Sequence, residues 1–169
     1  MATAWSARPE TAADTVAIRE VNLAAFPSAE EADLVDALRA SDAWIDGLSI
    51  VAEGPDGTVV AHALLSRCHV DAAPALALAP CAVLPRVQRT GAGSAAIRAG
   101  LDAARALGEN LVIVLGHPAY YPRFGFVPAS AFGVHPSFEV PDEALMALGL
   151  DPSRETPRGT IAYAAPFGV

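Results

Sequence analysis

The sequence predicts an α/β fold built as one domain around a mixed sheet. A nearly unbroken apolar run, Ala75 to Leu84, is typical of a buried strand. After Gly91 the pattern changes, because Ile97, Leu101 and Ala104 recur at helical spacing. The chain has 169 residues, which is enough for one sizeable core, and no repeat or linker divides it. We therefore assign the whole chain to one domain.

The first half of the chain is expected to form a strand, two helices and a β-hairpin. Ser28 and Glu31 have the spacing of a capping box, which predicts the start of the second helix. The segment Gly54-Pro55-Asp56-Gly57 has the chemistry of a tight turn, which joins the hairpin strands. The expected bounds are Ala2–Arg8 for the weakly patterned strand, Thr11 or Asp14 to about Phe26 for the first helix, Ser28 to about Ala40 for the second, and Leu48–Glu53 and Thr58–Val70 for the hairpin.

The second half is expected to continue with the strand Ala75–Leu84, the helix after Gly91 and a strand at Leu111–Leu115. Gly116-His117-Pro118 then opens a short helix that ends before Gly125. The segment after Pro128 is rich in Pro and Gly, and a last strand is expected at Thr160–Phe167. On this pattern the core spans about residues 2–127, and residues 128–169 form a C-terminal extension.

Composition excludes several classes of protein. The net charge of -8 and the pI of about 4.8 argue against bulk binding of nucleic acid. An acidic surface favours a cationic or amine partner, although it is also an ordinary means of staying soluble. No apolar stretch free of helix breakers is long enough for a membrane span, and the N-terminus lacks the pattern of a signal peptide. Cys68 and Cys81 have neither metal-ligand nor disulfide-framework spacing, so we expect a cytoplasmic protein without a metal.

The loop between the strand Ala75–Leu84 and the following helix carries the strongest functional signal. It delivers Gly91, Ala92 and Gly93 to the start of the helix. The first backbone N–H groups of a helix have no intrahelical partner, and the helix dipole is positive there. Glycine removes side chains that would hold a ligand away from those groups. The sequence therefore predicts a site for a phosphate or pyrophosphate group.

Two common phosphate loops fit this segment poorly. A P-loop requires a lysine after its last glycine, and none is present. The run from Gly91 to Ala96 matches the looser dinucleotide pattern G-x-G-x-x-A. That pattern should follow its strand directly, but Pro85 to Thr90 intervene. It also needs an acidic residue on the next strand, and Leu111–Leu115 carries none, which argues against a nicotinamide cofactor.

A third loop fits better. Gln88-Arg89-Thr90-Gly91-Ala92-Gly93 matches the pattern [QR]-x-x-G-x-[GA] and resembles the coenzyme-A loop of the GCN5-related N-acetyltransferase (GNAT) superfamily. The segment Ala119 to Phe126, AYYPRFGF, resembles that family's later Y-x-x-x-G-F element. With SAEEADLVDALR near the front, the pattern is similar to the YhbS-like subgroup and covers about Val16 to Phe126. The resemblance implies a single-domain, GNAT-like fold with a mixed, mostly antiparallel central sheet flanked by helices.

The resemblance also implies acetyl-CoA as co-substrate and transfer of its acetyl group to a primary amine of a small molecule or a protein. Backbone groups of the loop would cradle the pyrophosphate, while the strand end would pair with the pantetheine arm. The residues expected at the coenzyme are Ala82, Val83, Leu84, Gln88, Arg89, Thr90, Gly91, Ala92, Gly93, Ser94, His117, Tyr121 and Phe124. Arg123 is expected either in solvent or at a coenzyme phosphate, and His117 could instead cap the short helix.

The same resemblance points to Tyr121, four residues before Gly125, as the acid that protonates the leaving thiolate. A phenol with a pKa near 10 suits that task. The adjacent Tyr120 is the alternative, and a purely packing role is open for both. Cys81 lies close to the expected thioester path and is read as a small buried hydrophobe.

The base that would accept the amine's proton is left open. The candidates are a water chain or one of His62, His69, Asp71, Glu30 and Glu31. The expected acceptor walls are Ala25–Glu31 and Phe132–Phe138. The rival function is a non-catalytic acyl-CoA-binding or sensor module with the same fold. A homodimer is left open, and neither nucleic acid nor a membrane is expected as a partner.

Overall fold

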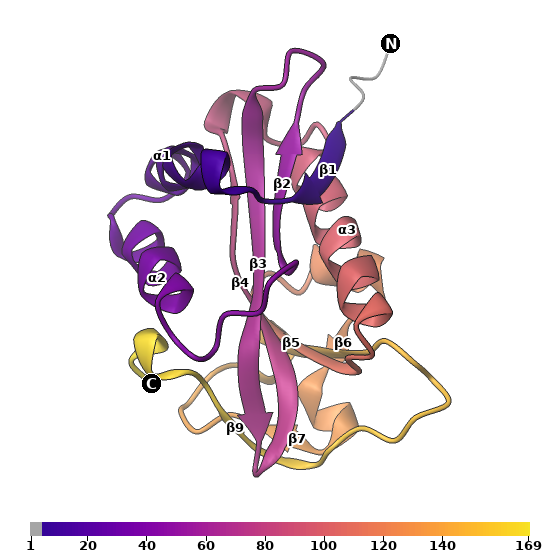
Figure 1. Ribbon diagram of the computed structural model, residues 1–169. Helices are drawn as coiled ribbons and strands as arrows, with labels where there is room; N and C mark the ends of the chain where they lie inside the picture. Colours follow the sequence, from indigo (N-terminus) through magenta and orange to yellow (C-terminus); the bar gives the residue numbers. More distant parts are fainter. Residues whose placement is uncertain (1–4) are drawn as a thin grey trace.

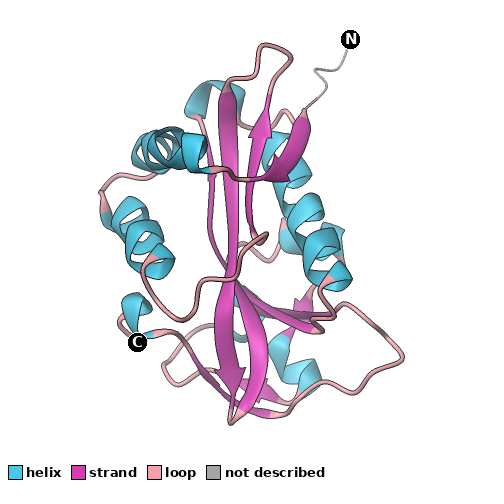
Figure 2. Ribbon diagram, in the orientation of Figure 1, coloured by secondary structure: helices cyan, strands magenta, loops and turns pink. Residues whose placement is uncertain are grey.

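The computed structural model describes residues 5–169, and a central sheet carries helices on both faces (Figure 1, Figure 2). The helices are α1 (Thr15–Ala25), α2 (Glu30–Arg39) and α3 (Ala92–Ala106). The strands are β1 (Ser6–Pro9), β2 (Ser49–Glu53), β3 (Val59–Val70), β4 (Ala73–Val83), β5 (Leu111–Leu115), β6 (Val127–Pro128), β7 (Val134–His135), β8 (Leu145–Gly149) and β9 (Gly159–Ala162). None of the helices in this described part is long and apolar enough to cross a membrane.

The strand order across the sheet is β1-β2-β3-β4-β5-β8-β6, and β9 pairs with the far end of β3 and with β7. Neighbouring strands along the main path are antiparallel except for β4 and β5, which run parallel. The predicted mixed, mostly antiparallel sheet is therefore confirmed.

The helices cover opposite faces of the sheet (Figure 1). On one face, Ile18 of α1 and Leu38 of α2 pack against sheet residues such as Leu64. On the other face, Ile97 and Leu101 of α3 are buried over β2 and β3. The helical spacing that predicted α3 is thus the spacing of its buried face.

The strands β4 and β5 diverge, and this divergence opens the sheet. They are paired only through Leu76 with Val112 and Ala77 with Ile113. Directly after these pairs, the register of β4 on β3 shifts between Leu78 and Cys81, so that Ala79 and Pro80 together oppose a single residue of β3. An extra residue of this kind bends a strand, and Pro80 has no N–H to donate to a neighbour. The far half of β4 therefore leaves β5.

The N-terminal elements differ in detail from the sequence prediction. The described strand β1 starts at Ser6, and residues 2–4 of the predicted strand lie outside the described residues. The predicted capping box is wrong: α2 begins at Glu30, and the Ser28 hydroxyl accepts a hydrogen bond from the Glu30 N–H (3.3 Å) instead of from Glu31. Helix α1 ends at Ala25, close to the predicted end.

The C-terminal third differs more. The predicted short helix after Pro118 is only a 3-10 turn at Tyr121–Phe124, and the last strand ends at Ala162 instead of Phe167. The sequence pattern predicts no strand between residues 128 and 159, which is wrong. Strand β8 pairs with β5 along its whole length, from Leu111 with Gly149 to Leu115 with Leu145. It is therefore part of the central sheet, with its residues 145–147 buried.

Candidate functional site

A cleft of about 750 Å³ opens where β4 leaves β5. Its walls come from the end of β4, the loop before α3, the first turn of α3 and the segment after β5. The residues that line it are Ala25, Phe26, Cys81, Val83, Gln88, Arg89, Gly91, Gly93, Ser94, Ile97, His117, Tyr120, Tyr121 and Arg123.

The loop before α3 turns by two left-handed residues, Arg89 (φ 63°) and Gly91 (φ 92°). The first bond of α3 runs from the Ala95 N–H to the Gly91 carbonyl (2.9 Å). The preceding N–H groups, of residues 92–94, therefore have no partner within the helix. At Gly93 a Cβ atom would lie 2.8 Å from Val83 Cγ2, so glycine lets the helix start approach β4. Of these residues Gly93 and Ser94 line the cleft, so N–H donors without a helical partner lie at its wall.

The charge of this cleft is opposite to the charge of the whole protein. The net charge of the chain is -8. Among the described residues that line the cleft, however, Arg89 and Arg123 are charged and no carboxylate is present. Arginines and free N–H groups at a helix start both favour a phosphate-bearing ligand.

The end of β4 offers backbone groups to the same cleft. The Leu84 N–H donates to the Val60 carbonyl (2.9 Å), so the peptide groups of Leu84 face β3. In an antiparallel pair the bonded residues alternate, and Val83 is opposite Ala61. The N–H and C=O groups of Val83 and Cys81 therefore face away from β3, on the side where β5 has diverged.

Tyr120 ties the segment after β5 to the start of α3. Its hydroxyl lies 3.0 Å from the Ser94 hydroxyl. The Arg123 guanidinium stacks on the Tyr120 ring at 4.2 Å and donates from Nε to the Tyr120 carbonyl (2.8 Å). These contacts hold Arg123 at the cleft, although its side chain is exposed.

Tyr121 lies against the end of β5, where its ring covers Gly116; a Cβ there would lie 2.4 Å from the ring. Burial raises the pKa of the Tyr121 phenol above its usual value, and the neighbouring Cys81 raises it further. Burial also raises the pKa of the Cys81 thiol to about 12, although contact with Tyr121 lowers it. Both groups are therefore protonated at neutral pH, and the Tyr121 hydroxyl can act as a proton donor.

A second cavity of about 550 Å³ meets the cleft at Tyr121. Both are lined by Phe26, Cys81, His117 and Tyr121. The remaining walls come from α2, β4, β5 and the C-terminal segment, with Glu31, Leu34, Ala77, Leu78, Ala79, Pro80, Ile113, Leu115, Gly116, Phe138, Tyr163, Phe167 and Val169. Tyr121 thus lies where a cleft whose charged side chains are arginines joins a largely apolar cavity.

Most of the residues expected at the coenzyme line the cleft together, namely Val83, Gln88, Arg89, Gly91, Gly93, Ser94, His117 and Tyr121. The side chains of Ala82, Leu84, Thr90, Ala92 and Phe124 do not line it. Ala82 is buried on the α1 side of the sheet, and the Thr90 hydroxyl donates to the Val87 carbonyl. Phe124 packs edge-on against Tyr120. Ala25, which was expected in the acceptor wall, lines this cleft instead, and so does Ile97, which no motif marked as a site residue.

The candidate bases are widely separated. His62 is buried away from both cavities, with Nδ1 accepting from the Asn22 amide (3.2 Å) and Nε2 lying 2.9 Å from the Ser49 hydroxyl. Burial lowers the pKa of His62 to about 3, with help from the charge of Arg39. His69 lies at the end of β3, and Asp71 accepts from the Thr160 N–H (2.9 Å).

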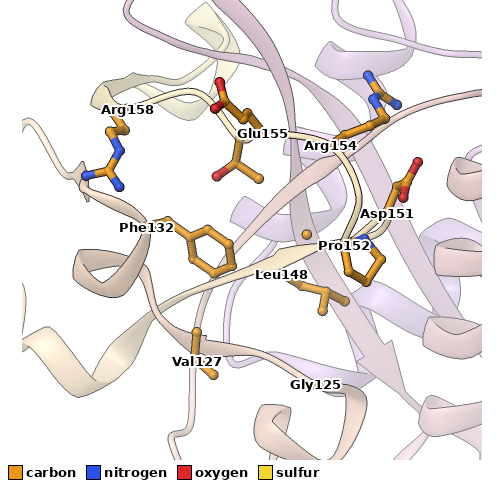
Figure 3. A pocket seen from close by; sticks show the side chains of 11 residues that line it. Gly125, Val127, Phe132, Leu148, Asp151, Pro152, Arg154, Glu155 and Arg158 are labelled. Atoms are coloured by element: carbon orange, nitrogen blue, oxygen red, sulfur yellow. The ribbon is translucent and has the colours of Figure 1, made fainter.

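Of the remaining candidates, Glu30 lines only an outer groove of α2, whereas Glu31 lines both that groove and the cavity that contains Tyr121. The expected acceptor wall 132–138 is divided between two cavities. Phe138 lines the Tyr121 cavity, but Phe132 lines a separate one of about 690 Å³ beside β8. In Figure 3 the ring of Phe132 stands near Val127 and Leu148, with Arg154 and Arg158 at the rim. Arg154 is bonded to the Gly108 carbonyl (2.7 Å), and none of the residues expected at the coenzyme lines this cavity.

Comparison with known proteins identifies the family. Residues 15–126 match the Acetyltransferase (GNAT) family, so this chain belongs to the GNAT acetyltransferases. It is 38% identical over 135 residues to the uncharacterized N-acetyltransferase YjhQ of Escherichia coli K12, covering 77% of this chain and 74% of that protein.

Solved structures agree with this family. The GNAT N-acetyltransferase YhbS of Escherichia coli, in complex with CoA, is similar over 100% of this chain and 94% of its own, with a TM-score of 0.91 and 26% identity. A GNAT acetyltransferase from Brucella melitensis, in complex with acetyl-CoA, is 32% identical, covers 98% of this chain and 99% of its own, and has a TM-score of 0.79.

Proposed function

We propose that this protein is an acetyl-CoA-dependent N-acetyltransferase that moves the acetyl group directly to a primary amine, with Tyr121 as the general acid. The observation that carries the proposal is the position of Tyr121, where a cleft suited to an anion meets a second cavity. The complexes of the two similar proteins with CoA and acetyl-CoA support the choice of coenzyme.

The residues of the cleft fit the parts of that coenzyme. The free N–H groups of residues 92–94, with Arg89 and Arg123 beside them, suit the pyrophosphate. The outward peptide groups of Val83 and Cys81 suit the amides of the pantetheine arm, which would extend the sheet in place of β5. An N–H group of β4 would then stabilise the negative charge that develops on the thioester oxygen.

The proposed reaction needs one proton donor and one proton acceptor. The acceptor's neutral nitrogen attacks the thioester carbonyl carbon, the C–N bond forms and the C–S bond breaks. Tyr121 donates its phenolic proton to the leaving sulfur, and the amine's proton passes to water or a nearby base. The raised pKa of Tyr121 keeps the phenol protonated before transfer. The same burial raises the pKa of the neighbouring Cys81 thiol. The leaving thiolate of the coenzyme would therefore also be a stronger base here than in water, and it would accept the proton of Tyr121 more readily.

Thermal unfolding with acetyl-CoA, NAD or ATP tests the coenzyme assignment. Acetyl-CoA at about 100 times its dissociation constant should add about 2.7 kcal/mol of stability. NAD and ATP should add little, because the cleft lacks the loop patterns of their usual sites. A larger effect of NAD would contradict the proposal.

Release of free thiol in the presence of a panel of primary amines then separates an enzyme from a binding module. The proposal expects thiol release that depends on an amine. Binding of acetyl-CoA without turnover of any amine would favour the rival acyl-CoA sensor. All eleven Lys and Arg residues of the chain are arginine, so the enzyme contains no lysine that could be acetylated. Any acetyl-lysine detected after the reaction therefore comes from the protein acceptor.

A further inference from the structure

The cavity on the far side of Tyr121 from the phosphate-binding loop has a distinct chemistry. We propose that it binds a small primary amine with an apolar, preferably aromatic, body. Glu31 holds the ammonium group, which gives up one proton to water or to the Glu31 carboxylate before its neutral nitrogen attacks the thioester. This inference rests on the proposed acetyltransferase function and names the acceptor class for the same site.

Charge distinguishes the two cavities that meet at Tyr121. The coenzyme cleft is lined by Arg89 and Arg123 and by no acidic side chain among the described residues. In the lining of the other cavity the described part of the chain supplies Glu31 as the acid and no arginine. One cavity thus favours an anion and the other a cation, as expected for an anionic coenzyme and an amine that meet at one phenol.

The body of the ligand must suit apolar walls. The ring of Tyr163 lies 6.1 Å from that of Phe138 and 5.3 Å from that of Phe167, so these side chains form an aromatic wall. Phe26 and Leu34 line the same cavity. A volume of about 550 Å³ is in the range of small-molecule sites, and a polar chain would lose its hydration there without gaining partners.

Glu31 carries the acidic side chain of this cavity, and among the described residues one oxygen of its carboxylate has no partner. Its Oε2 atom is buried, and no described residue donates a hydrogen bond to it. The neighbouring acids of the first turn of α2 differ, because Glu30 is exposed and Asp33 pairs with Arg19 (3.0 Å). A buried carboxylate oxygen without a donor is costly, and an ammonium group would satisfy it.

Calorimetric titration of the CoA-loaded protein tests the assignment with matched ligands. The compounds are 2-phenylethylamine, its uncharged analogue 2-phenylethanol, the polar diamine putrescine, and Nα-acetyl-lysine methylamide as a stand-in for a protein lysine. The variants are Glu31→Gln and, as the matched control on the same helical turn, Glu30→Gln.

The wild type should bind 2-phenylethylamine about tenfold or more tighter than 2-phenylethanol, because a charge-assisted bond is added. Glu31→Gln should abolish this preference, whereas Glu30→Gln should keep it. Putrescine and the lysine derivative should bind more weakly than 2-phenylethylamine. The KM for 2-phenylethylamine should rise in Glu31→Gln while the KM for acetyl-CoA is unchanged.

An equal preference in wild type and Glu31→Gln, or tighter binding of putrescine or the lysine derivative, would overturn this inference. The acetyltransferase assignment would survive either result if acetyl-CoA binds and any amine is acetylated. Failure of CoA to bind at all would instead overturn the proposed function, and this inference with it.

Discussion

At the scale of single residues, the proposed function gives Tyr121 a catalytic role that can be separated from its packing role. Its ring packs against Gly116, and the residue lines both cavities. Tyr121→Phe keeps the ring and removes the proton donor. We therefore expect the dissociation constant for acetyl-CoA to stay within about twofold, while kcat falls by about 100-fold or more. Calorimetry and a thiol-release assay measure the two quantities.

The matched control is Tyr120→Phe, which removes the adjacent hydroxyl and its contact with Ser94. Because that contact is structural, kcat should change much less than in Tyr121→Phe. A Tyr121→Phe enzyme with normal kcat, or a larger loss in Tyr120→Phe, would move the acid role away from Tyr121.

His62 gives a stability prediction that does not depend on the coenzyme. Its folded-state pKa is lowered to about 3 from an ordinary value of 6.5, because the imidazole is buried. Between pH 6.5 and pH 3 the imidazole is protonated in the unfolded chain but not in the folded protein. The free energy of unfolding therefore falls as the pH falls. At pH 5 this amounts to about 2 kcal/mol relative to pH 7. Denaturant unfolding at both pH values measures the loss.

The variant His62→Asn removes this titration, so its stability should depend less on pH between 6.5 and 4, even if it is less stable at pH 7. Asp14 contributes little to the pH dependence in this range. Arg8 lowers the pKa of Asp14 to about 2 from 3.8, so the stabilisation that Asp14 provides is lost mainly at lower pH. Equal pH dependence of the two proteins would show that His62 is protonated in the folded state.

At the scale of elements, the two ends of α3 provide a matched pair of glycines. Gly91 (φ 92°) precedes the helix and Gly108 (φ 82°) follows it, and a Cβ would meet nothing within 4 Å at either. Replacement of either by alanine should cost about 1 kcal/mol through its left-handed backbone. Of the two variants, only Gly91→Ala should also lower the affinity for acetyl-CoA, because Gly91 lines the cleft and Gly108 does not.

Thermal unfolding and calorimetry of both variants measure these effects. A comparable loss of acetyl-CoA affinity in Gly108→Ala would mean that the effect comes from general destabilisation of α3 and not from the loop.

The same elements show what the sequence could predict. Local patterns sufficed for α3 and its loop, because helical spacing and glycine chemistry are properties of neighbouring residues. The capping box at Ser28 failed because α2 begins one residue later than the box requires, so that the Ser28 hydroxyl accepts from the Glu30 N–H. The bend at Ala79 and Pro80 and the strand β8 depend on pairing with distant strands, which no short window contains.

The candidate site divides in the same way. The residues of the loop and of the segment after β5 could be found from short motifs. Phe138 was expected in the acceptor wall, whereas Tyr163 and Phe167 had no motif. These two residues reach the second cavity because the C-terminal segment packs beside α2 (Figure 1). Glu31 was one of several candidates until the fold placed it in that cavity and separated it from His62 and Asp71.

At the scale of the whole molecule, the chain beyond residue 127 completes the sheet and the second cavity. β8 covers the edge of β5, and β9 pairs with β3 through His69 and Val70. The buried residues Met146, Ala147 and Ile161 have at most 1% of their surface exposed. The boundary that the sequence suggested after about residue 127 therefore stays a prediction that can be tested against this packing.

We expect a chain of residues 1–127 not to fold cooperatively, because it would expose the edge of β5 and the apolar surface that β8 and β9 cover. A chain of residues 1–162 keeps both strands and should unfold cooperatively, although it lacks Tyr163 and Phe167 of the aromatic wall. Circular dichroism during denaturant unfolding compares the two with the full chain. Cooperative unfolding of residues 1–127 would instead establish an independent core, with the later strands as an addition. If residues 1–162 fold and bind acetyl-CoA but lose affinity for 2-phenylethylamine, the C-terminal segment serves the acceptor cavity and not the stability of the sheet.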